Sequence, residues 1–181
     1  KRQMVRCLHQ SGITVAHSFD IRERISFYEK LCRSHGALLF EDYEEVRGWM
    51  DWLMDTLDSM EHPKCLCHID ANVDNFLFFE DGSVKLLDWE YAGMCDPVMD
   101  VSMCAIYSYY NEEDMERLFR LYLQREPSED ELFALYANAA LGGFLWCLWA
   151  VYKSILGDEF GEYTIIMYRY AKKYYRKLRK L

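Results

Sequence analysis

Hydrophobic side chains recur at helical spacing between Glu41 and Met60. They are Val46, Trp49, Met50, Leu53, Met54, Leu57 and Met60. Side chains separated by three, four and seven positions share one face of an α-helix. The pattern therefore predicts an amphipathic helix over residues 41–60 whose apolar face packs in a core, and we assign that face no chemistry.

Similar periodicity lies on both sides of this stretch. Residues 1–40 are predicted to be mainly helical, with a break at Ser11-Gly12 and a second periodic stretch from Ile21 to Cys32. Helical periodicity returns near Val98, beyond an irregular stretch that contains Gly and Pro. These patterns predict a largely helical chain.

Three more helix signals follow toward the carboxyl terminus. Asn111 precedes three acidic residues, and carboxylates in a first turn stabilise a helix start. Ser128 and Glu131 have the spacing of a capping box, which predicts the beginning of a long apolar helix. A last helix is predicted over residues 162–180, and its basic end suits a helix C-terminus.

The segment from Ala134 to Tyr152 has no formally charged side chain, and it is long enough to span a bilayer. A helix buried on all sides of a globular core gives the same signal. Asn138 and the Gly142-Gly143 pair interrupt the segment, and patterns typical of soluble helices flank it. We therefore expect a core helix and no stable membrane insertion.

Two apolar runs, Phe76–Phe79 and Val84–Leu87, flank an Asp81-Gly82 dipeptide. Strand-forming residues around Asp-Gly are a strong signal for a β-hairpin. Together with the helices, the hairpin predicts an α+β fold that is mainly α, with a helical bundle and one small β-hairpin.

The amino-acid composition and net charge limit the classes of partner that we expect for this chain. The chain is 51% hydrophobic and 16% aromatic, which argues for an ordered domain, and its net charge of −9 argues against nucleic acid as the main partner. Seven cysteines form no Cys-x-x-Cys pair, which fits buried thiols in a reducing cytoplasm better than disulfides. We do not expect zinc, because Cys65-x-Cys67 has no matching second pair of ligands in the sequence.

The motif His68-x-Asp70-x4-Asn75, followed by the hairpin and Asp88, has the layout of a phosphoryl-transfer site. An antiparallel hairpin returns the chain to where it started, so we expect Asn75 and Asp88 side by side at one end of it. Two oxygen ligands suit Mg²⁺, which takes its other ligands from phosphates and water. We predict that Asp70 is the catalytic residue that orients an acceptor hydroxyl, and that Asn75 and Asp88 are metal ligands.

Signals for nucleotide binding are missing. The sequence has no Gly-x-Gly-x-x-Gly motif, no phosphate-binding loop and no recognisable pair of a strand Lys and a helix Glu before Asp70. In kinase-like enzymes these parts precede the catalytic loop. Because the chain also begins with Lys rather than Met, we expect a carboxyl-terminal lobe whose nucleotide-clamping lobe is absent. Its expected parts are a helical segment (1–62), the catalytic loop with the metal-binding hairpin (63–100) and a helical substrate-binding part (101–181).

The sequences Cys67-His-Ile-Asp70, Asn75-Phe-Leu-Phe and Leu87-Asp88-Trp-Glu-Tyr91-Ala resemble the choline and ethanolamine kinases, and most of all the bacterial choline kinases. Phe144–Trp149 and Glu159–Gly161 share this resemblance. These kinases belong to a protein-kinase-like group that includes the aminoglycoside phosphotransferases. The resemblance implies a kinase-like carboxyl-terminal lobe, ATP as co-substrate and Mg²⁺ as the metal ion.

The resemblance also implies roles for three further residues. Asp100 resembles the aspartate at a helix start that braces the catalytic loop of this group. His68 would fix the same loop and would not carry a proton. Glu90 would face either the ammonium group of the substrate or the surroundings of the metal ion.

Trp146 and Trp149 are three positions apart, so both indoles project from one face of a helix. A quaternary ammonium group cannot donate a hydrogen bond, and aromatic faces recognise it through cation–π attraction of about 0.5–2 kcal/mol per ring. The pair is either core packing or part of a cage for such a cation, and beside the kinase motif we favour the cage. The resemblance suggests as further walls Tyr91, either Tyr109 or Tyr110, and Tyr163.

We therefore expect a lobe of a choline kinase that transfers the γ-phosphoryl group of ATP to choline, and we expect the separated lobe to be inactive. Two alternatives stay open. A kinase for ethanolamine, another amino alcohol or an aminoglycoside would bind its amine through carboxylates. An isolated lobe would instead act as a non-catalytic binding module.

Overall fold

In the computed structural model, which describes residues 2–37, 40–61 and 63–180, the chain forms two units that alternate along the sequence. The first unit comprises Lys1–Phe19 and Glu61–Asn138, and the second comprises Asp20–Met60 and Ala139–Leu181. The predicted helical segment 1–62 thus contributes to both units. Its expected last residue, His62, lies outside the described residues.

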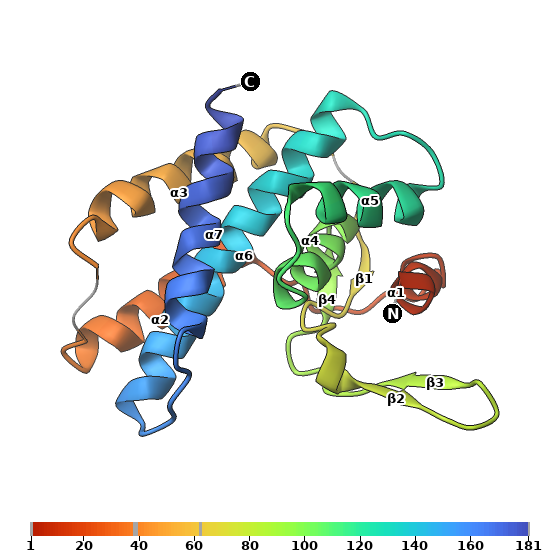
Figure 1. Ribbon diagram of the computed structural model, residues 1–181, viewed down its shortest axis with the longest axis horizontal. Coiled ribbons are helices and arrows are strands. Elements are labelled where there is room, and N and C mark those ends of the chain that lie inside the picture. Colours follow the sequence, from red (N-terminus) through yellow and green to blue (C-terminus); the bar gives the residue numbers. More distant parts are fainter. Residues whose placement is uncertain (1, 38–39, 62, 181) are drawn as a thin grey trace. The chain divides into compact units, whose positions relative to one another are not determined.

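Helices and two small ribbons make up the first unit (Figure 1). Its helices are α1 (Arg2–His9), α4 (Pro97–Tyr107), α5 (Glu112–Leu123) and the beginning of α6 (Glu129–Ile155). Helix α1 packs against α4 and α5, and both α1 and α4 contact the strand β1 (Cys65–Cys67), which leads into the His68–Asn75 loop. Helix α4 also holds this loop directly through hydrogen bonds to Asp100. This arrangement places the loop motif within a helical framework.

Both ribbons of the first unit are antiparallel pairs of three-residue strands. Strand β1 pairs with β4 (Gly93–Cys95), so that Cys65 lies opposite Cys95. Strand β2 (Phe76–Phe78) pairs with β3 (Val84–Leu86), and a short 3₁₀ helix, η1 (Val73–Asn75), leads into β2. Figure 1 shows the β2–β3 hairpin extending away from η1.

The turn of the β2–β3 hairpin forms at the predicted Asp-Gly dipeptide. Gly82 has a φ of 79°, a left-handed conformation that glycine adopts at little cost. The Asp81 carboxylate accepts a hydrogen bond from the backbone N–H of Ser83 at 2.8 Å. The resulting register lets the backbone N–H of Leu87 donate to the carbonyl oxygen of Asn75 at 2.8 Å, which returns the chain to the entrance of the hairpin.

Helices α2 (Ile21–Ser34), α3 (Tyr43–Asp58) and α7 (Tyr163–Leu178) form the second unit together with the rest of α6. Helix α3 packs against α7, and the predicted apolar face of α3 is largely buried. Trp49 lies on the same helix and stacks on Tyr175 of α7, with ring centroids 4.5 Å apart. The amphipathic pattern thus predicted the packing face correctly.

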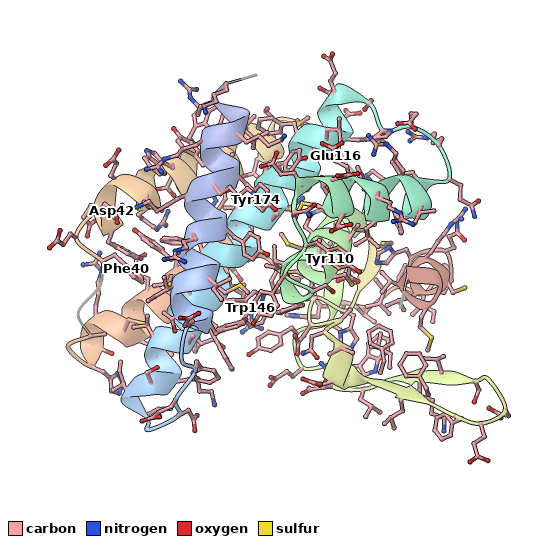
Figure 2. All side chains as sticks on the ribbon, in the orientation of Figure 1. Phe40, Asp42, Tyr110, Glu116, Trp146 and Tyr174 are labelled. Carbon is pink, nitrogen blue, oxygen red and sulfur yellow. The ribbon has the colours of Figure 1, made fainter. Side chains whose placement is uncertain are left out.

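The connection before α3 is tied to α7 by aromatic and ionic contacts (Figure 2). Phe40 stacks on Tyr168 with ring centroids 3.9 Å apart. The Tyr168 hydroxyl donates to the Asp42 carboxylate at 2.8 Å, and Lys172 forms an ion pair with the same carboxylate. These contacts lower the pKa of Asp42, with the hydrogen bond from Lys172 as the largest cause.

The predicted mainly α fold is confirmed, and so are the predicted helices and the hairpin. The capping box is reciprocal: the N–H of Ser128 donates to the Glu131 carboxylate at 2.8 Å, and the N–H of Glu131 donates to Ser128 Oγ at 3.2 Å. The prediction of a single hairpin was incomplete, because it missed the β1–β4 ribbon. Its strands are too short to show an alternating pattern, and β4 begins with glycine.

Helix α6 contains the uncharged segment described above. Among the described residues it is the one helix long and apolar enough to cross a membrane by length and composition. In the structure, 83% of its most apolar 18-residue window is buried. Burial of this extent is what a core helix shows.

Candidate active site

The catalytic-loop motif begins directly after β1 with two buried residues, His68 and Ile69. Ile69 has a φ of 72°. A β-branched residue is disfavoured in this left-handed region, and such a conformation costs about 1–3 kcal/mol unless its surroundings stabilise it. The loop therefore needs specific contacts to keep its shape.

Asp100, in the first turn of α4, provides these contacts. The backbone N–H of His68 donates to Asp100 Oδ2 at 2.8 Å, and the N–H of Ile69 donates to Oδ1 at 2.5 Å. The Asp100 side chain is fully buried, and Nε2 of His9 lies 2.9 Å from its Oδ2. Hydrogen bonds to an ionised acceptor are roughly twice as strong as neutral ones, so one carboxylate holds both backbone amides in place.

The His68 ring connects the loop to the end of the β2–β3 hairpin. Its Nε2 lies 2.8 Å from the carbonyl oxygen of Leu87, and its ring meets Trp89 edge to face with centroids 4.8 Å apart. A carbonyl oxygen only accepts, so Nε2 carries the hydrogen. This geometry gives His68 a positional contact between two segments, in keeping with the role that the resemblance implies.

Asp70 points its carboxylate at two amide side chains of the same loop. Asn72 Nδ2 donates to Oδ1 at 3.1 Å, and Asn75 Nδ2 donates to Oδ2 at 2.9 Å and to the Asp70 carbonyl oxygen at 2.8 Å. Burial raises the pKa of the Asp70 carboxyl, whereas hydrogen bonds from Tyr107, Asn72 and Asn75 act in the opposite direction. Burial has the larger effect, so the carboxylate is a stronger base than an exposed Asp.

Asn75 and Asp88 lie at the same end of the β2–β3 ribbon. The hydrogen bond from the N–H of Leu87 to the carbonyl oxygen of Asn75 places Asp88 one residue beyond the partner of Asn75. Because Asn75 uses its amide nitrogen toward Asp70, its Oδ1 remains as a possible metal ligand. Asp88 is exposed with a φ of 57°, a conformation that Asp tolerates. These donors fit Mg²⁺, which prefers a few carboxylate or carbonyl oxygens.

The other predicted site residues of the first unit differ in how far they are exposed to solvent. Glu90 is exposed, Tyr91 is buried, and Tyr109 is 56% exposed with a φ of 53°. Tyr107, which the sequence analysis did not single out, is the tyrosine that interacts with Asp70. It lies 37 positions after Asp70 and no motif marks it, so only the fold reveals this contact.

Trp146 and Trp149 meet in the second unit, as their spacing predicts. Their rings form an edge-to-face pair with centroids 5.9 Å apart; Trp146 is buried and Trp149 is half-buried. Phe160 packs edge to face on Trp149 at 4.9 Å and lies 6.2 Å from Tyr163. We call these four rings the aromatic cluster. Phe160 was not among the predicted cage residues, although it lies in the Glu159–Gly161 sequence that shares the family resemblance.

A cation already approaches the aromatic cluster. The Lys153 ammonium lies 5.9 Å from the Trp149 ring centroid. This distance is within the range of cation–π attraction. The exposed side of Trp149 is therefore compatible with a positively charged group.

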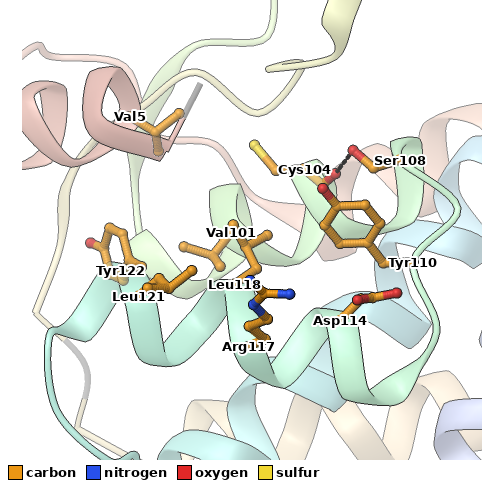
Figure 3. A pocket seen from close by; sticks show the side chains of 10 residues that line it. All are labelled: Val5, Val101, Cys104, Ser108, Tyr110, Asp114, Arg117, Leu118, Leu121 and Tyr122. Carbon is orange, nitrogen blue, oxygen red and sulfur yellow. Dashed lines mark hydrogen bonds between the residues drawn. The ribbon is translucent and has the colours of Figure 1, made fainter.

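A separate cavity of about 310 Å³ lies between α1, α4 and α5 in the first unit (Figure 3). Its walls are mainly apolar, with Asp114 and Arg117 at one side. Of the tyrosines suggested above, Tyr110 lines it. Asp70, Asn75 and Asp88 are not among its lining residues, so this cavity is not where the phosphoryl-transfer motif lies.

A mainly α fold with a braced His-x-Asp-x4-Asn loop and a short β-hairpin is typical of kinase-like phosphotransferases. The model of the phosphotransferase enzyme family matches residues 8–136. The chain belongs to this family.

The chain is similar to proteins named LicA, one of them a choline kinase of solved structure, and to an ethanolamine kinase. Protein LicA of Haemophilus influenzae is 27% identical over 167 residues, which cover 87% of this chain and 48% of that protein. The crystal structure of choline kinase LicA from Streptococcus pneumoniae has a TM-score of 0.83 at 28% identity and covers 97% of this chain and 62% of that chain. Ethanolamine kinase 1 of Mus musculus is 26% identical over 151 residues, covering 68% of this chain and 42% of that protein.

These matches confirm the resemblance stated from the motifs. A further structure of LicA, in complex with AMP, has a TM-score of 0.84 at 28% identity. The chain spans about half the length of the curated relatives it matches.

We predict that Asn72→Asp raises the pKa of the Asp70 carboxyl above its already raised wild-type value. The substitution keeps the oxygen that caps Asp74 N–H, but it replaces the amide donor to Asp70 with a second negative charge. Carboxyl-carbon NMR titration of the full-length protein measures this pKa. The pKa of Asp70 should then lie above the ordinary range for Asp in the wild type and higher still in the variant.

Asn111→Asp is the matched control, because Asn111 caps a helix in the same way through Asp114 N–H and is not among the contacts of Asp70. It should leave the Asp70 titration unchanged. An Asp70 pKa at or below the ordinary value in the wild type, or no rise in Asn72→Asp, would contradict the account of this loop.

Proposed function

We propose that the full-length protein containing this chain is a choline kinase that transfers the γ-phosphoryl group of ATP to choline, giving phosphocholine and ADP. The observation that carries the proposal is Asp70, held by Asn72 and Asn75 in a loop that Asp100 braces. Similarity to choline kinase LicA over 97% of this chain supports choline as the acceptor.

Asp70 has the chemistry of the acceptor-binding base. Its carboxylate accepts the hydroxyl proton of choline as the bond from that oxygen to the γ-phosphorus forms and the bond from the γ-phosphorus to ADP breaks. Because the transition state of phosphoryl transfer is loose, the main contribution is the position of the hydroxyl. The raised pKa makes the ionised carboxylate a better base, and the rate is lost as pH falls through that raised value.

Asn75 and Asp88 are the residues we propose for magnesium. A magnesium ion held by these two side chains would supply positive charge that offsets the negative charge of the phosphates. The amide of Asn75 also orients Asp70, so this side chain connects the proposed base with the proposed metal site. ATP as the nucleotide is supported by the solved LicA complex with AMP.

The aromatic cluster is our candidate for recognition of the trimethylammonium group. Trp149 offers a partly exposed indole beside Phe160, and the Lys153 ammonium, 5.9 Å from the Trp149 ring centroid, supports this role. A quaternary ammonium group needs aromatic faces, whereas a primary amine gains more from carboxylates that accept its N–H bonds. The residues of the cluster thus favour choline over an aminoglycoside.

Ethanolamine is the second candidate acceptor. The similarity to mouse ethanolamine kinase 1 at 26% identity supports it. Choline and ethanolamine carry the same hydroxyl and differ in the methylation of the nitrogen, so the site at Asp70 does not distinguish them. The distinction rests on the aromatic cluster.

We predict that Asp70→Asn in the full-length protein lowers kcat by about 10²- to 10⁴-fold, because the amide cannot accept the hydroxyl proton. ³¹P NMR of phosphocholine formation measures the rate, and ATP affinity measured by calorimetry should change little. Asp74→Asn, an exposed position in the same loop, is the matched control and should retain activity. Full turnover in Asp70→Asn would refute the assignment of the base.

Trp149→Leu should raise KM for choline by about 2- to 30-fold with little change in kcat, which corresponds to the loss of one cation–π contact. KM for ethanolamine should rise less. Trp52→Leu is the control, since Trp52 lies on α3, where it contacts Tyr175 and Arg179. Equal rises for both substrates, or an unchanged KM for choline, would contradict this role of the aromatic cluster.

A further inference from the structure

Three side chains with metal-binding atoms converge in the first unit, away from Asn75 and Asp88. They are His9 of α1 and Cys65 and Cys67 of β1, and one ligand atom from each lies within 4.8 Å of the others. His9 is 56 positions before Cys65 in the sequence, and the packing of α1 against β1 brings it there. Zinc was not expected from the sequence, because no second pair of ligands matches Cys65 and Cys67; in the fold, His9 supplies a third ligand.

The distance between the two sulfur atoms matches one coordination geometry. Cys65 Sγ and Cys67 Sγ are 3.8 Å apart, because alternate residues of a strand point to the same side. Two thiolates bound to a tetrahedral zinc ion at about 2.3 Å are about 3.8 Å apart. The strand therefore holds the sulfur pair at the required separation without rearrangement of its backbone.

The His9 ring has the partner that metal-bound histidines usually have. Its Nε2 lies 2.9 Å from Asp100 Oδ2, and since a carboxylate only accepts, Nε2 carries the hydrogen. The lone pair of the neutral ring is then on Nδ1, which in this structure lies 2.8 Å from the hydroxyl of Tyr122. A carboxylate that accepts from one ring nitrogen orients the ring and makes the other nitrogen a better ligand.

Burial and donor type define the class of ion. Cys67 is buried, the His9 side chain is 3% exposed and Cys65 is half-buried, which leaves one accessible edge to the cluster. Two sulfur donors and one imidazole select a thiophilic ion with tetrahedral preference and disfavour Mg²⁺. Three protein ligands leave the fourth position for water, as in zinc sites with an open coordination position.

We propose that His9, Cys65 and Cys67 form a binding site for a thiophilic tetrahedral cation of the zinc type. The site is independent of the proposed magnesium ligands. Asp100 joins it to the catalytic loop, because the same carboxylate accepts from His9, His68 and Ile69.

Titration of the reduced full-length protein with Co²⁺, in the presence of excess Mg²⁺, tests the proposal. Tetrahedral Co²⁺ bound to thiolates gives intense visible bands and a sulfur-to-metal charge-transfer band that oxygen ligands do not give. We expect one such ion per chain, displaced by Zn²⁺. Cys65→Ser should reduce the charge-transfer band and weaken Zn²⁺ affinity by at least about tenfold.

Cys7→Ser is the matched control, because Cys7 is exposed on the same helix as His9 and is not part of the cluster. It should bind Co²⁺ as the wild type does. Circular dichroism verifies the fold of each variant, and alkylation of Cys65 in folded Cys7→Ser protein removes the same ligand without a new variant. Zn²⁺ should protect Cys65 from this alkylation.

Two results would overturn the proposal. One is the lack of a thiolate charge-transfer band in the wild-type protein. The other is a band that persists unchanged when Cys65 is substituted or alkylated.

Discussion

The carboxylate of Asp100 is the constraint on which the candidate active site depends. It is fully buried and accepts hydrogen bonds from two consecutive backbone amides, those of His68 and Ile69. The second of these residues is a buried isoleucine in a left-handed conformation. Without a strong acceptor at this position, the loop would lose the contacts that offset about 1–3 kcal/mol of backbone strain. Asp100 thus links the start of α4 to the chemistry of the loop.

The residues next to this hydrogen-bonded pair of amides carry the polar groups of the candidate active site. Asp70 follows Ile69, and its carboxylate meets the amide of Asn75, where the β2–β3 hairpin begins. The His68 ring reaches the carbonyl oxygen of Leu87, where the same hairpin ends. The proposed base and the proposed metal ligand Asn75 are therefore held by one short network. The aromatic cluster belongs to the second unit and is built from α6, α7 and the turn between them.

Local signals in the sequence predicted local structure well. The Asp-Gly turn, the capping box of α6 and the shared face of Trp146 and Trp149 depend on residues a few positions apart, and all three are present. Contacts between distant segments were not predictable from spacing. Tyr107 near Asp70 and the contact of His9 with Asp100 require the packing of helices that no motif specifies. The brace at Asp100 was expected from family resemblance alone, and its two hydrogen bonds became visible only in the structure.

Amide hydrogen exchange at His68 and Ile69, measured by NMR on the full-length protein, tests the central role of Asp100 most directly. Both residues lie outside any helix or strand, yet the account predicts that their amides exchange far more slowly than those of Glu80 and Asp81 at the exposed hairpin tip. In Asp100→Asn the acceptor has no charge, so the amides of His68 and Ile69 should exchange faster. Loss of a hydrogen bond to a charged acceptor corresponds to about 10- to 150-fold faster exchange. Exchange of the wild-type amides at the rate of the hairpin tip would contradict the account.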